Sequence, residues 1–454
     1  MPATQSKPET EKATERHLSI AQRKRMLTLL KVSTFFSIVQ HTITIQTEPM
    51  LVKELCNNDA AKGTRALANT QGLVGILGLF LNQAGGKFSD AIGRKPFLLL
   101  GPLGNILLGA LVVKNSSSPL LVLVCRVIRM VITTFSNTVI VGAAMTDVVS
   151  GDDLAREYSK IGSVVGAGMI AAPIFENIAL RRLGSLRGPY VVLSVLGALH
   201  ATFNMLLMSE TLVPQKRTSL SDINFSAFNP FGFLNIYFKG SRHLQKFVTI
   251  VSFQMFLEGK NLSDIGMTWM REHIKWNINK IRNYVVAYGA LCIGTGTYLT
   301  PYLIKNTTTR GFTVLTDMLQ AVSYILRGSS ETAMMWLATV PLILPGVNAN
   351  TALRLKSLAA DHAKAEGFGK GEFSAWINNL RALSSSLSPV IYGNWYAMSQ
   401  KRGLPAGTVY HVAAILGALL PEALLCLTSD VELKPPTQRS ESLSPLDSAQ
   451  SDKT

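Results

Sequence analysis

The sequence predicts an all-α membrane protein with twelve transmembrane helices arranged in two six-helix bundles. The first observation is composition: 47% of the 454 residues are hydrophobic and 16% are charged, whereas soluble domains carry about 25% charged residues. The second is a series of apolar windows long enough to cross a bilayer, and the third is one long polar connection in the middle of the chain. An integral membrane protein follows from the three together.

The apolar windows fix the expected helices. A spanning helix needs about 20 mostly apolar residues, and the first, seventh and eleventh windows also carry polar residues that a lipid-facing helix does not tolerate. Short connections join most of the windows, so twelve helices is the simplest count. In chain order the windows are 27–48, 67–84, 97–113, 119–143, 160–180, 189–208, 245–266, 283–304, 311–327, 332–351, 371–397 and 407–428.

The long internal connection, Ser209 to Phe247, separates six windows from six. The start of the chain is polar and lacks the apolar core of a cleavable signal peptide, so we expect it to be retained. The end is rich in serine and proline, which is typical of disorder. The predicted parts are an N-terminal tail (1–26), an N-terminal bundle (27–208), a central loop (209–244), a C-terminal bundle (245–428) and a disordered C-terminal tail (429–454).

Basic residues set the expected orientation. Lys and Arg gather on the cytoplasmic side of membrane proteins, which places both termini and the central loop in the cytoplasm. The stretch "MREHIKWNINKIR" breaks this pattern, because it would then lie outside. The sequence is compatible with the plasma membrane or an internal membrane. The residues behind the assignment are Arg23, Lys24, Arg25, Lys87, Arg94, Lys95, Lys216, Arg217, Lys239, Arg242 and Lys246.

Several function classes are excluded or disfavoured. The net charge of +16 would suggest nucleic-acid binding in a soluble chain, but here the basic residues flank apolar windows. The four cysteines show no metal or disulfide spacing, and the chain has no P-loop. We therefore expect no enzyme activity, no cofactor, no metal and no nucleic-acid partner.

The stretch "GGKFSDAIGRKP" lies between the second and third windows. Gly86 allows close helix packing, and Gly93 suits the end of a helix and a chain reversal. Asp90, Arg94 and Lys95 place both signs of charge at one membrane face, where they can latch helix ends together. A simple basic turn explains the lysines but not the embedded aspartate or the glycine spacing.

The pattern G-x-x-x-D-x-x-G-R-[KR] in this stretch resembles the signature loop of the major facilitator superfamily. The similarity extends towards the drug:proton antiporter branch, which includes tetracycline efflux proteins and hippocampus-abundant-transcript-like transporters. "AAMTDVVSGDDLARE" resembles that branch's exit from the fourth helix. "NPFGFLNIYFKGSRHL" resembles its central loop, and "GEFSAWINNLRALSSSLSPVIYGNWY" its eleventh helix.

The resemblance implies a gating role for this loop. Asp90 would interact with the N-terminal end of the eleventh helix, and Arg94 would pair with Asp147 at the end of the fourth helix. Together with Gly86, Gly93 and Lys95, these residues would latch the two halves while the cavity faces outward. Breaking the latch would favour the inward-facing state.

The fourth helix departs from the family pattern. The family carries R-x-x-x-G there, whereas "CRVIRMVIT" offers Arg126 and Arg129 without the glycine. An arginine inside a spanning helix normally faces a cavity or a partner. Arg129 lies closer to the usual distance from Asp147 and is the proton-coupling candidate, while Arg126 lies near the outer end, where an arginine can snorkel to water.

The fifth helix departs as well. "GSVVGAGMIAAPIFEN" matches the antiporter glycine motif, whose small residues allow close helix packing, but glutamate and asparagine follow the proline in place of glycines. This weakens the antiporter assignment and makes Glu176 a second proton-coupling candidate. The alternative is that Glu176 lies near the outer surface, hydrated or paired with an arginine. The packing residues are Gly162, Gly166, Gly168 and Pro173.

The resemblance implies that helices one, four, seven and ten line the central cavity. Gln40, His41 and Gln254 are therefore the expected substrate-cavity residues. Glu258 is a third proton-coupling candidate, with pairing to Lys260 as the alternative.

The leading function is secondary active transport of a small organic molecule by alternating access, as proton-coupled efflux. One alternative is a metabolite symporter or uniporter of the same fold, and an alternative of another class is a receptor or scaffold that transports nothing. The expected partners are a small-molecule substrate, protons and the lipid bilayer, and we expect a monomer.

Overall fold

The structure is a computed structural model that describes residues 19–115, 117–149, 151–212, 214, 217, 219, 229–257, 262–368, 370–430 and 432–433. These residues form helices and turns and contain no β-strand. Most of the two predicted tails and part of the central loop lie outside the described residues. Within the described part of the chain the all-α prediction is confirmed.

Each of the first six predicted windows contains helix, and several helices extend beyond their windows. The window 67–84, for example, lies inside a helix of 33 residues, because backbone hydrogen bonding continues where the chain leaves the apolar region. The helices are α2 (Ile20–Thr42), α3 (Thr47–Leu55), α4 (Ala60–Ile92), α5 (Arg94–Lys114), α6 (Pro119–Thr134), the π-helix Phe135–Ile140, α7 (Val141–Val148), α8 (Gly151–Leu183) and α9 (Gly188–Leu207).

The six windows of the second half contain helix too, often in several pieces. The helices are α10 (Leu234–Lys239), α11 (Arg242–Gln254), α12 (Ser263–Glu272), α13 (Ile278–Gly294), α14 (Thr300–Asn306), α15 (Thr309–Gly328), α16 (Ala333–Ala338), α17 (Val340–Ile343), α18 (Leu353–Ala365), α19 (Lys370–Lys401), α20 (Thr408–Ala414) and α21 (Leu420–Cys426). A 3-10 segment follows each of α11 and α17, and a short π-helical segment follows each of α13 and α20.

Two of the three windows with polar residues are broken helices. In the first, α2 ends at Thr42 and α3 begins at Thr47; in the seventh, α11 ends at Gln254 and α12 begins at Ser263. The eleventh lies within the single helix α19. Irregular backbone at membrane depth needs partners from the protein, and polar side chains at a break supply them.

Contacts divide the chain into two compact units, assigned as Met1–Thr44, Leu81–Lys114 and Ile128–Phe225 for unit 1, and Ile45–Phe80, Asn115–Val127 and Ser226–Thr454 for unit 2. Unit 2 thus contains one end of the first, second and fourth helices together with the second half of the sequence. The boundaries predicted for the bundles, 27–208 and 245–428, stay a prediction about the two sequence halves.

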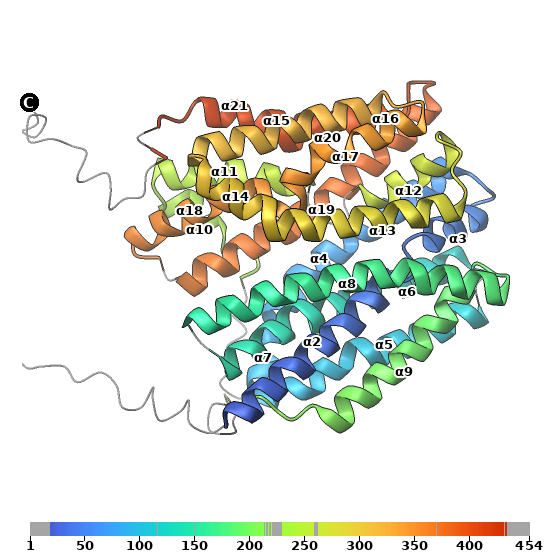
Figure 1. The fold of residues 1–454 in the computed structure, drawn as a ribbon, viewed down its shortest axis with the longest axis horizontal. Helices are drawn as coiled ribbons and strands as arrows, with labels where there is room; N and C mark the ends of the chain where they lie inside the picture. The colour runs from blue at the N-terminus through green and yellow to red at the C-terminus, as the bar shows by residue number, and fades with distance from the viewer. Residues whose placement is uncertain are drawn as a thin grey trace, which may run out of the picture. The chain divides into compact units, whose positions relative to one another are not determined.

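Unit 1 is held together by close helix pairs. In Figure 1, α5 lies beside α9 and α2 beside α8. A Cβ atom on Gly109 would lie 2.9 Å from the carbonyl oxygen of Tyr190, and one on Gly168 would lie 2.7 Å from Ile38 Cγ2. Small residues therefore let these backbones approach, as is usual in membrane proteins.

Unit 2 contains two large buried clusters. One is aliphatic and aromatic around α11, α18 and α19 and includes Phe247, Leu355 and Trp376. The other is unusually rich in aromatic residues and includes Trp269, Tyr324, Trp336, Tyr392 and Tyr410 from five different helices. This second cluster holds several polar atoms at depth.

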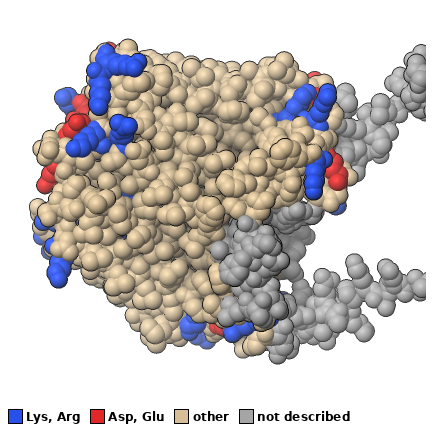
Figure 2. All heavy atoms as spheres, turned by 180° about the vertical axis from the view of Figure 1, so that it is seen from behind, with Lys and Arg blue, Asp and Glu red and all other residues tan. Residues whose placement is uncertain are grey.

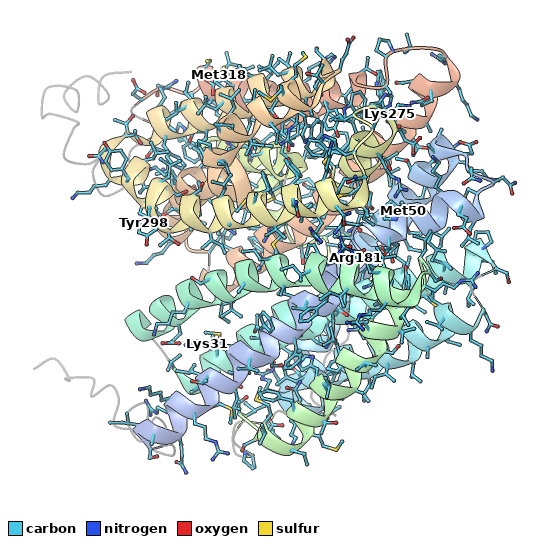
Figure 3. The ribbon with its side chains drawn as sticks, turned by 45° about the vertical axis from the view of Figure 1, so that its right-hand side comes forward. Lys31, Met50, Arg181, Lys275, Tyr298 and Met318 are labelled. Carbon is cyan, nitrogen blue, oxygen red and sulfur yellow. The ribbon has the colours of Figure 1, made fainter. Side chains whose placement is uncertain are left out.

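Large apolar side chains cover the described surface. Leu100, Leu103, Leu107 and Leu111 form an exposed stripe along α5, and Tyr298, 77% exposed, points away from its unit (Figure 3). Figure 2 shows a face on which charged side chains gather at the margins. Such a stripe would be unfavourable in water by about 25 cal/mol for each Å², whereas lipid solvates it.

By length and composition, five helical segments of the described chain are apolar enough to cross a membrane. They are Ile20–Leu55, Arg94–Lys114, Ser163–Leu183, Gly188–Leu207 and Thr408–Cys426.

Candidate functional site

The turn between α4 and α5 requires a glycine. Gly93 has a φ of +118°, a conformation that side chains with a Cβ rarely adopt. A Cβ here would also lie 2.4 Å from Glu210 Oε2. The predicted helix stop at Gly93 therefore corresponds to the observed end of α4 at Ile92 and start of α5 at Arg94. At Gly86, by contrast, an added Cβ would meet no described atom within 4 Å.

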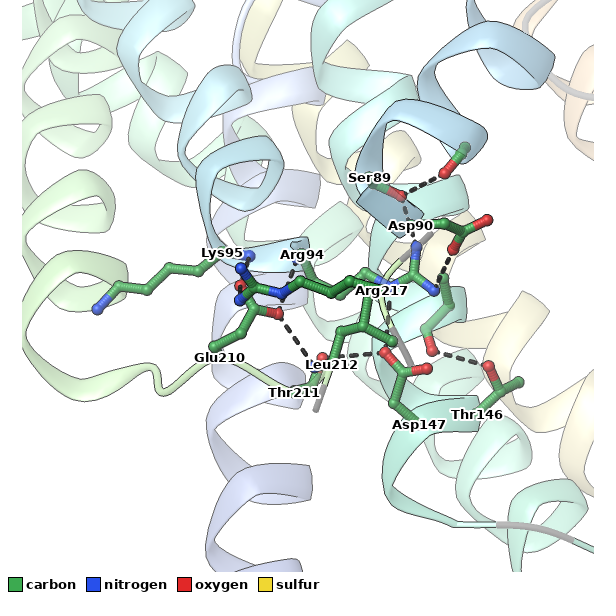
Figure 4. A network of polar contacts seen from close by, with 12 residues as sticks. Ser89, Asp90, Arg94, Lys95, Thr146, Asp147, Glu210, Thr211, Leu212 and Arg217 are labelled. Atoms are coloured by element: carbon green, nitrogen blue, oxygen red, sulfur yellow. Dashed lines mark hydrogen bonds and ion pairs between the residues drawn. The ribbon is translucent and has the colours of Figure 1, made fainter. Parts of the chain in front are cut away.

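Arg94 is the centre of a network within unit 1 (Figure 4). Its Nε donates to Asp147 Oδ2 at 3.0 Å, Nη2 lies 2.6 Å from Asp90 Oδ1, and Nη1 donates to Ser89 Oγ at 2.5 Å. The Arg94 side chain is 7% exposed and that of Asp147 is 14% exposed. The structure thus brings together Arg94 and Asp147, which the resemblance pairs, and adds Ser89, which the sequence did not single out.

Glu210 lies at the N-terminus of α5, beside the Arg94 network (Figure 4). Its carboxylate accepts from the backbone N–H of Arg94 at 2.8 Å and of Lys95 at 3.1 Å, so a negative charge satisfies the free N–H groups at a helix N-terminus. Lys95 Nζ donates to the carbonyl of Met205 at 2.9 Å. Sequence reasoning missed Glu210, although an acidic residue directly after the sixth window was a usable signal.

Arg129 is buried at the break in the first helix. Its Nη1 donates to the carbonyl of Gln40 at 3.2 Å and its Nη2 to Thr44 Oγ1 at 3.0 Å. The carbonyls at the C-terminus of α2 favour a cation. The structure therefore places Arg129 as a stabiliser of the broken backbone, and its role in proton coupling stays a prediction.

Gln40 belongs to a buried polar network in unit 1. Its Nε2 lies 3.2 Å from His200 Nδ1, and its Oε1 accepts from Asn105 Nδ2 at 2.6 Å. Ser33 Oγ and Asn204 Nδ2 contact the other ring nitrogen of His200 at 2.8 and 3.2 Å. Gln40 is fully buried, so here its amide joins helices, and contact with a substrate stays a prediction for it and for His41.

Gln254 lies at the end of α11 and is also buried. Its Nε2 donates to Asp317 on α15, at 2.9 Å to Oδ2 and 3.2 Å to Oδ1. Asp317 is fully buried, and Glu422 on α21 is an electrostatic neighbour of it. A buried acidic group in a membrane protein is a functional candidate by default, so the burial of Asp317 makes it a candidate as well.

Arg126 links three segments of unit 2. One Nη donates to Glu48 on α3, and the other lies 2.6 Å from Asp264 Oδ2 on α12 and 3.5 Å from Gln71 Oε1 on α4. The side chains of Arg126 and Glu48 are 2% and 5% exposed. Arg126 therefore does not snorkel to the surface. We call Arg126, Glu48 and Asp264 the Arg126 cluster.

Further contacts join the same first-half helices to the second half. Lys53 Nζ on α3 lies 2.6 Å from Glu272 Oε1 on α12, and Ser386 Oγ on α19 donates to the carbonyl of Gly72 on α4 at 2.7 Å. A Cβ on Gly75 would lie 2.8 Å from the backbone nitrogen of Ser386. At this end the helices of the two sequence halves are in direct backbone contact.

The remaining predicted residues are placed as follows. Glu176 is fully buried in α8, Arg181 follows on the same helix (Figure 3), and the role of Glu176 in proton coupling stays a prediction. Gly162, Gly166, Gly168 and Pro173 all lie in α8. Glu258 lies outside the described residues. Across the described chain, no group of three His, Cys, Asp or Glu residues is arranged to hold a metal ion.

Glu157 gives a prediction for the pH dependence of stability. It lies in α8 outside the span Ser163–Leu183, and hydrogen bonds from Lys160 and then Lys31 hold the pKa of its carboxyl below the usual range. Its stabilising contribution is therefore present above the unfolded-state pKa of about 4.3 and is lost as the pH falls through the lower folded-state pKa.

We expect Glu157→Gln to lower the free energy of unfolding by about 1 kcal/mol at pH 7 and to have a smaller effect as the pH falls below about 4. Thermal unfolding of both proteins in one detergent at pH 7 and below about pH 4 measures this, with Asp361→Asn, an exposed carboxylate on α18, as the control. An equal difference at both pH values would contradict the assignment.

Comparison with known proteins gives a consistent family match. The sequence model of the Major Facilitator Superfamily matches residues 32–389. The chain is 24% identical over 351 residues to the tetracycline resistance protein, class C, of Escherichia coli, covering 75% of this chain and 81% of that protein. It is 25% identical over 359 residues to hippocampus abundant transcript-like protein 1 of Bos taurus, covering 77% and 68%.

Solved structures share the fold. The nucleoside transporter NupG matches with a TM-score of 0.68 and 14% identity, over 89% of this chain and 100% of that chain. The human organic anion transporter MFSD10 matches with a TM-score of 0.63 and 15% identity, over 89% and 99%. At these identities the likeness establishes the fold alone.

Proposed function

Because the chain belongs to the Major Facilitator Superfamily, we propose that this multi-pass membrane protein exports a small organic molecule in exchange for protons. Secondary transport is the common activity of such folds, and a tetracycline resistance protein is among its relatives. The exchange for protons, the direction of transport and a monomeric state are parts of the proposal.

The Arg126 cluster is the observation that carries the proposal. Alternating access requires contacts between the two sequence halves that form at one membrane face and break when that face opens. Arg126 supplies such a contact, because it joins α3 and α6 of the first half to α12 of the second. Ion pairs suit this role because water can solvate each charge once the contact opens.

The network around Arg94 is proposed to latch the opposite face. Gly86, Asp90, Gly93, Arg94, Lys95 and Asp147 keep the gating role that the resemblance implies, with this face and both termini in the cytoplasm. Glu210 adds a fixed negative charge beneath α5. The interaction of Asp90 with the eleventh helix belongs to the proposal.

Buried polar residues are proposed to carry the coupled proton and to contact the substrate. Arg129, Glu176 and Glu258 are the coupling candidates from the sequence, and Asp317 joins them on the basis of its burial. Gln40, His41 and Gln254 are the substrate-cavity candidates. A change of conformation that frees their side chains from the present hydrogen bonds is part of this proposal.

Flux in proteoliposomes tests the function directly. Proteoliposomes are loaded with a panel of radiolabelled organic compounds, and the flux of each compound is measured with and without an imposed proton gradient. At least one compound is expected to move against the direction of proton movement. Glu176→Gln and Asp317→Asn are each expected to reduce gradient-driven flux about tenfold, within the usual range of coupling energies, and the exposed Asp361→Asn to leave it unchanged.

The alternatives give different results. Flux in the same direction as the protons indicates a symporter, and flux that ignores the gradient indicates a uniporter. Binding without flux of any compound indicates a receptor or scaffold. Full coupling in both Glu176→Gln and Asp317→Asn would remove these two carboxylates from the mechanism.

A further inference from the structure

The aromatic cluster of unit 2 contains one arginine, Arg327, in the last turn of α15. Arg327 is 8% exposed, and within the described part of the chain no carboxylate lies within ion-pair distance of it. Buried charges in proteins are normally paired or bound to a ligand. Among the residues that the structure describes, this buried guanidinium therefore has no carboxylate partner.

Neutral groups surround the guanidinium. Nε donates to Thr339 Oγ1 at 2.9 Å and Nη2 to the hydroxyl of Tyr284 at 3.3 Å. The guanidinium carbon lies 4.8 Å from the centre of the Trp336 ring and 5.8 Å from that of Tyr324. These contacts position Arg327 and provide cation–π attraction, but they contribute no negative charge.

Unsatisfied donors lie in the same aromatic cluster. The indole nitrogens of Trp336 and Trp269 and the hydroxyl of Tyr410 are buried and have no hydrogen-bond partner in the described part of the chain. Ring contacts connect them, since Tyr410 lies 5.8 Å from Trp336 and 5.6 Å from Trp269 between ring centres. Tyr410 is also an electrostatic neighbour of Arg327.

The missing partner of these groups is a hydrogen-bond acceptor that carries negative charge. An indole N–H and a guanidinium can only donate, and each unsatisfied buried donor costs about 1–3 kcal/mol. A water molecule would satisfy a donor but would leave the charge of Arg327 unbalanced. A carboxylate does both, because its two oxygens accept up to four hydrogen bonds and match the fork of an arginine.

We propose that this cluster binds a small aromatic carboxylate, with the carboxylate on Arg327, Trp336 and Tyr410 and the apolar body against the surrounding rings. Binding requires the rings to move apart from their present packing. The inference that such a carboxylate is the transported substrate rests on the proposed function. The inference that the cluster binds it does not.

Equilibrium dialysis of radiolabelled benzoate against the full-length protein in detergent tests the site, with empty micelles as the blank. Benzamide has the same shape without the charge and is expected to compete at least about 100-fold more weakly, equivalent to about 2.7 kcal/mol. Saturable binding of benzoate at one site for each chain is the expected result. Equal competition by benzamide, or no saturable binding, would overturn the proposal.

Conservative variants locate the site. Arg327→Gln is expected to abolish measurable binding. Tyr410→Phe, which removes only the O–H, and Trp336→Phe, which removes the N–H together with part of the ring, are expected to weaken it about tenfold each. Trp376→Phe and Tyr237→Phe are the matched controls, because Trp376 belongs to the other buried cluster of unit 2 and Tyr237 packs against that cluster. Unchanged binding in Trp336→Phe and Tyr410→Phe overturns the site even where Arg327→Gln does not fold.

Failure of the site and failure of the proposed function are distinguishable. Benzoate binding without flux of any compound supports the site and contradicts transport. Gradient-driven flux of uncharged or cationic compounds, without benzoate binding, supports transport and contradicts the site.

Discussion

Arg126→Gln is expected to lower the free energy of unfolding by about 3–5 kcal/mol, because it leaves one buried and one partly buried carboxylate without their shared cation. Glu48 and Asp264 both contact this guanidinium, and the Glu48 side chain is 5% exposed. Transport is expected to fall with stability, since the face that these residues are proposed to close can no longer be held shut.

Thermal unfolding in detergent, with flux measured in parallel, checks this prediction. Lys53→Gln is the matched control, because the pair of Lys53 with Glu272 joins the same two helices but is about one-third exposed on both sides. An exposed pair contributes about 1 kcal/mol or less. Equal loss of stability in Arg126→Gln and Lys53→Gln would show that Arg126 has no special role.

Two further variants separate charge from geometry. Arg126→Lys keeps the charge but loses the planar fork that reaches both carboxylates, so an intermediate loss is expected. The triple variant Glu48→Gln, Arg126→Gln, Asp264→Asn removes all three charges and is expected to recover much of the stability. A non-additive result of this kind is what a directly coupled cluster requires.

Arg94→Ala is expected to reduce the transport rate about 100-fold, near the upper end of typical coupling between distant sites, with a smaller effect on folding. The substitution removes three contacts at once, to Ser89, Asp90 and Asp147. The Asp90 side chain is 44% exposed, so water replaces its lost partner, whereas the Asp147 side chain is only 14% exposed and loses its main cation.

Flux in proteoliposomes measures the effect, and labelling of an introduced cysteine reports which face is open. Asp147→Asn is expected to reproduce most of the loss, and the double variant to add little to Arg94→Ala, because both substitutions break one contact. Arg217→Gln is the control, since Arg217 is partly exposed and 4.0 Å from Glu210. Independent, additive effects of Arg94→Ala and Asp147→Asn would contradict a shared latch.

The helix stop at Gly93 and the helices of the apolar windows could be predicted from the local sequence. Gly93 has the positive φ that a sharp stop between two helices demands, and every predicted window contains helix. The first, seventh and eleventh windows carried polar residues that did not fit a lipid-facing helix, and the helix is broken in the first and the seventh of them. Local composition thus determined where helices form, and Gly93 marked the turn between two of them.

Side-chain partners were harder to predict. Resemblance to a family indicated the pair of Arg94 and Asp147, which the structure brings to 3.0 Å. It gave no indication of Glu210 beneath α5, and it favoured Arg129 over Arg126 for function. The structure instead places Arg126 between two carboxylates and Arg129 at a backbone break.

The sequence by itself determined that this is a helical membrane protein of the Major Facilitator Superfamily, with a charged turn between its second and third helices. Only the tertiary structure decided which buried polar groups meet. The reason is physical: lipid and protein interior are both apolar, so hydropathy places a helix in the membrane without fixing which face it turns inward. Arg327, Trp336 and Tyr410 lie on three different helices, and only packing brings their donors together.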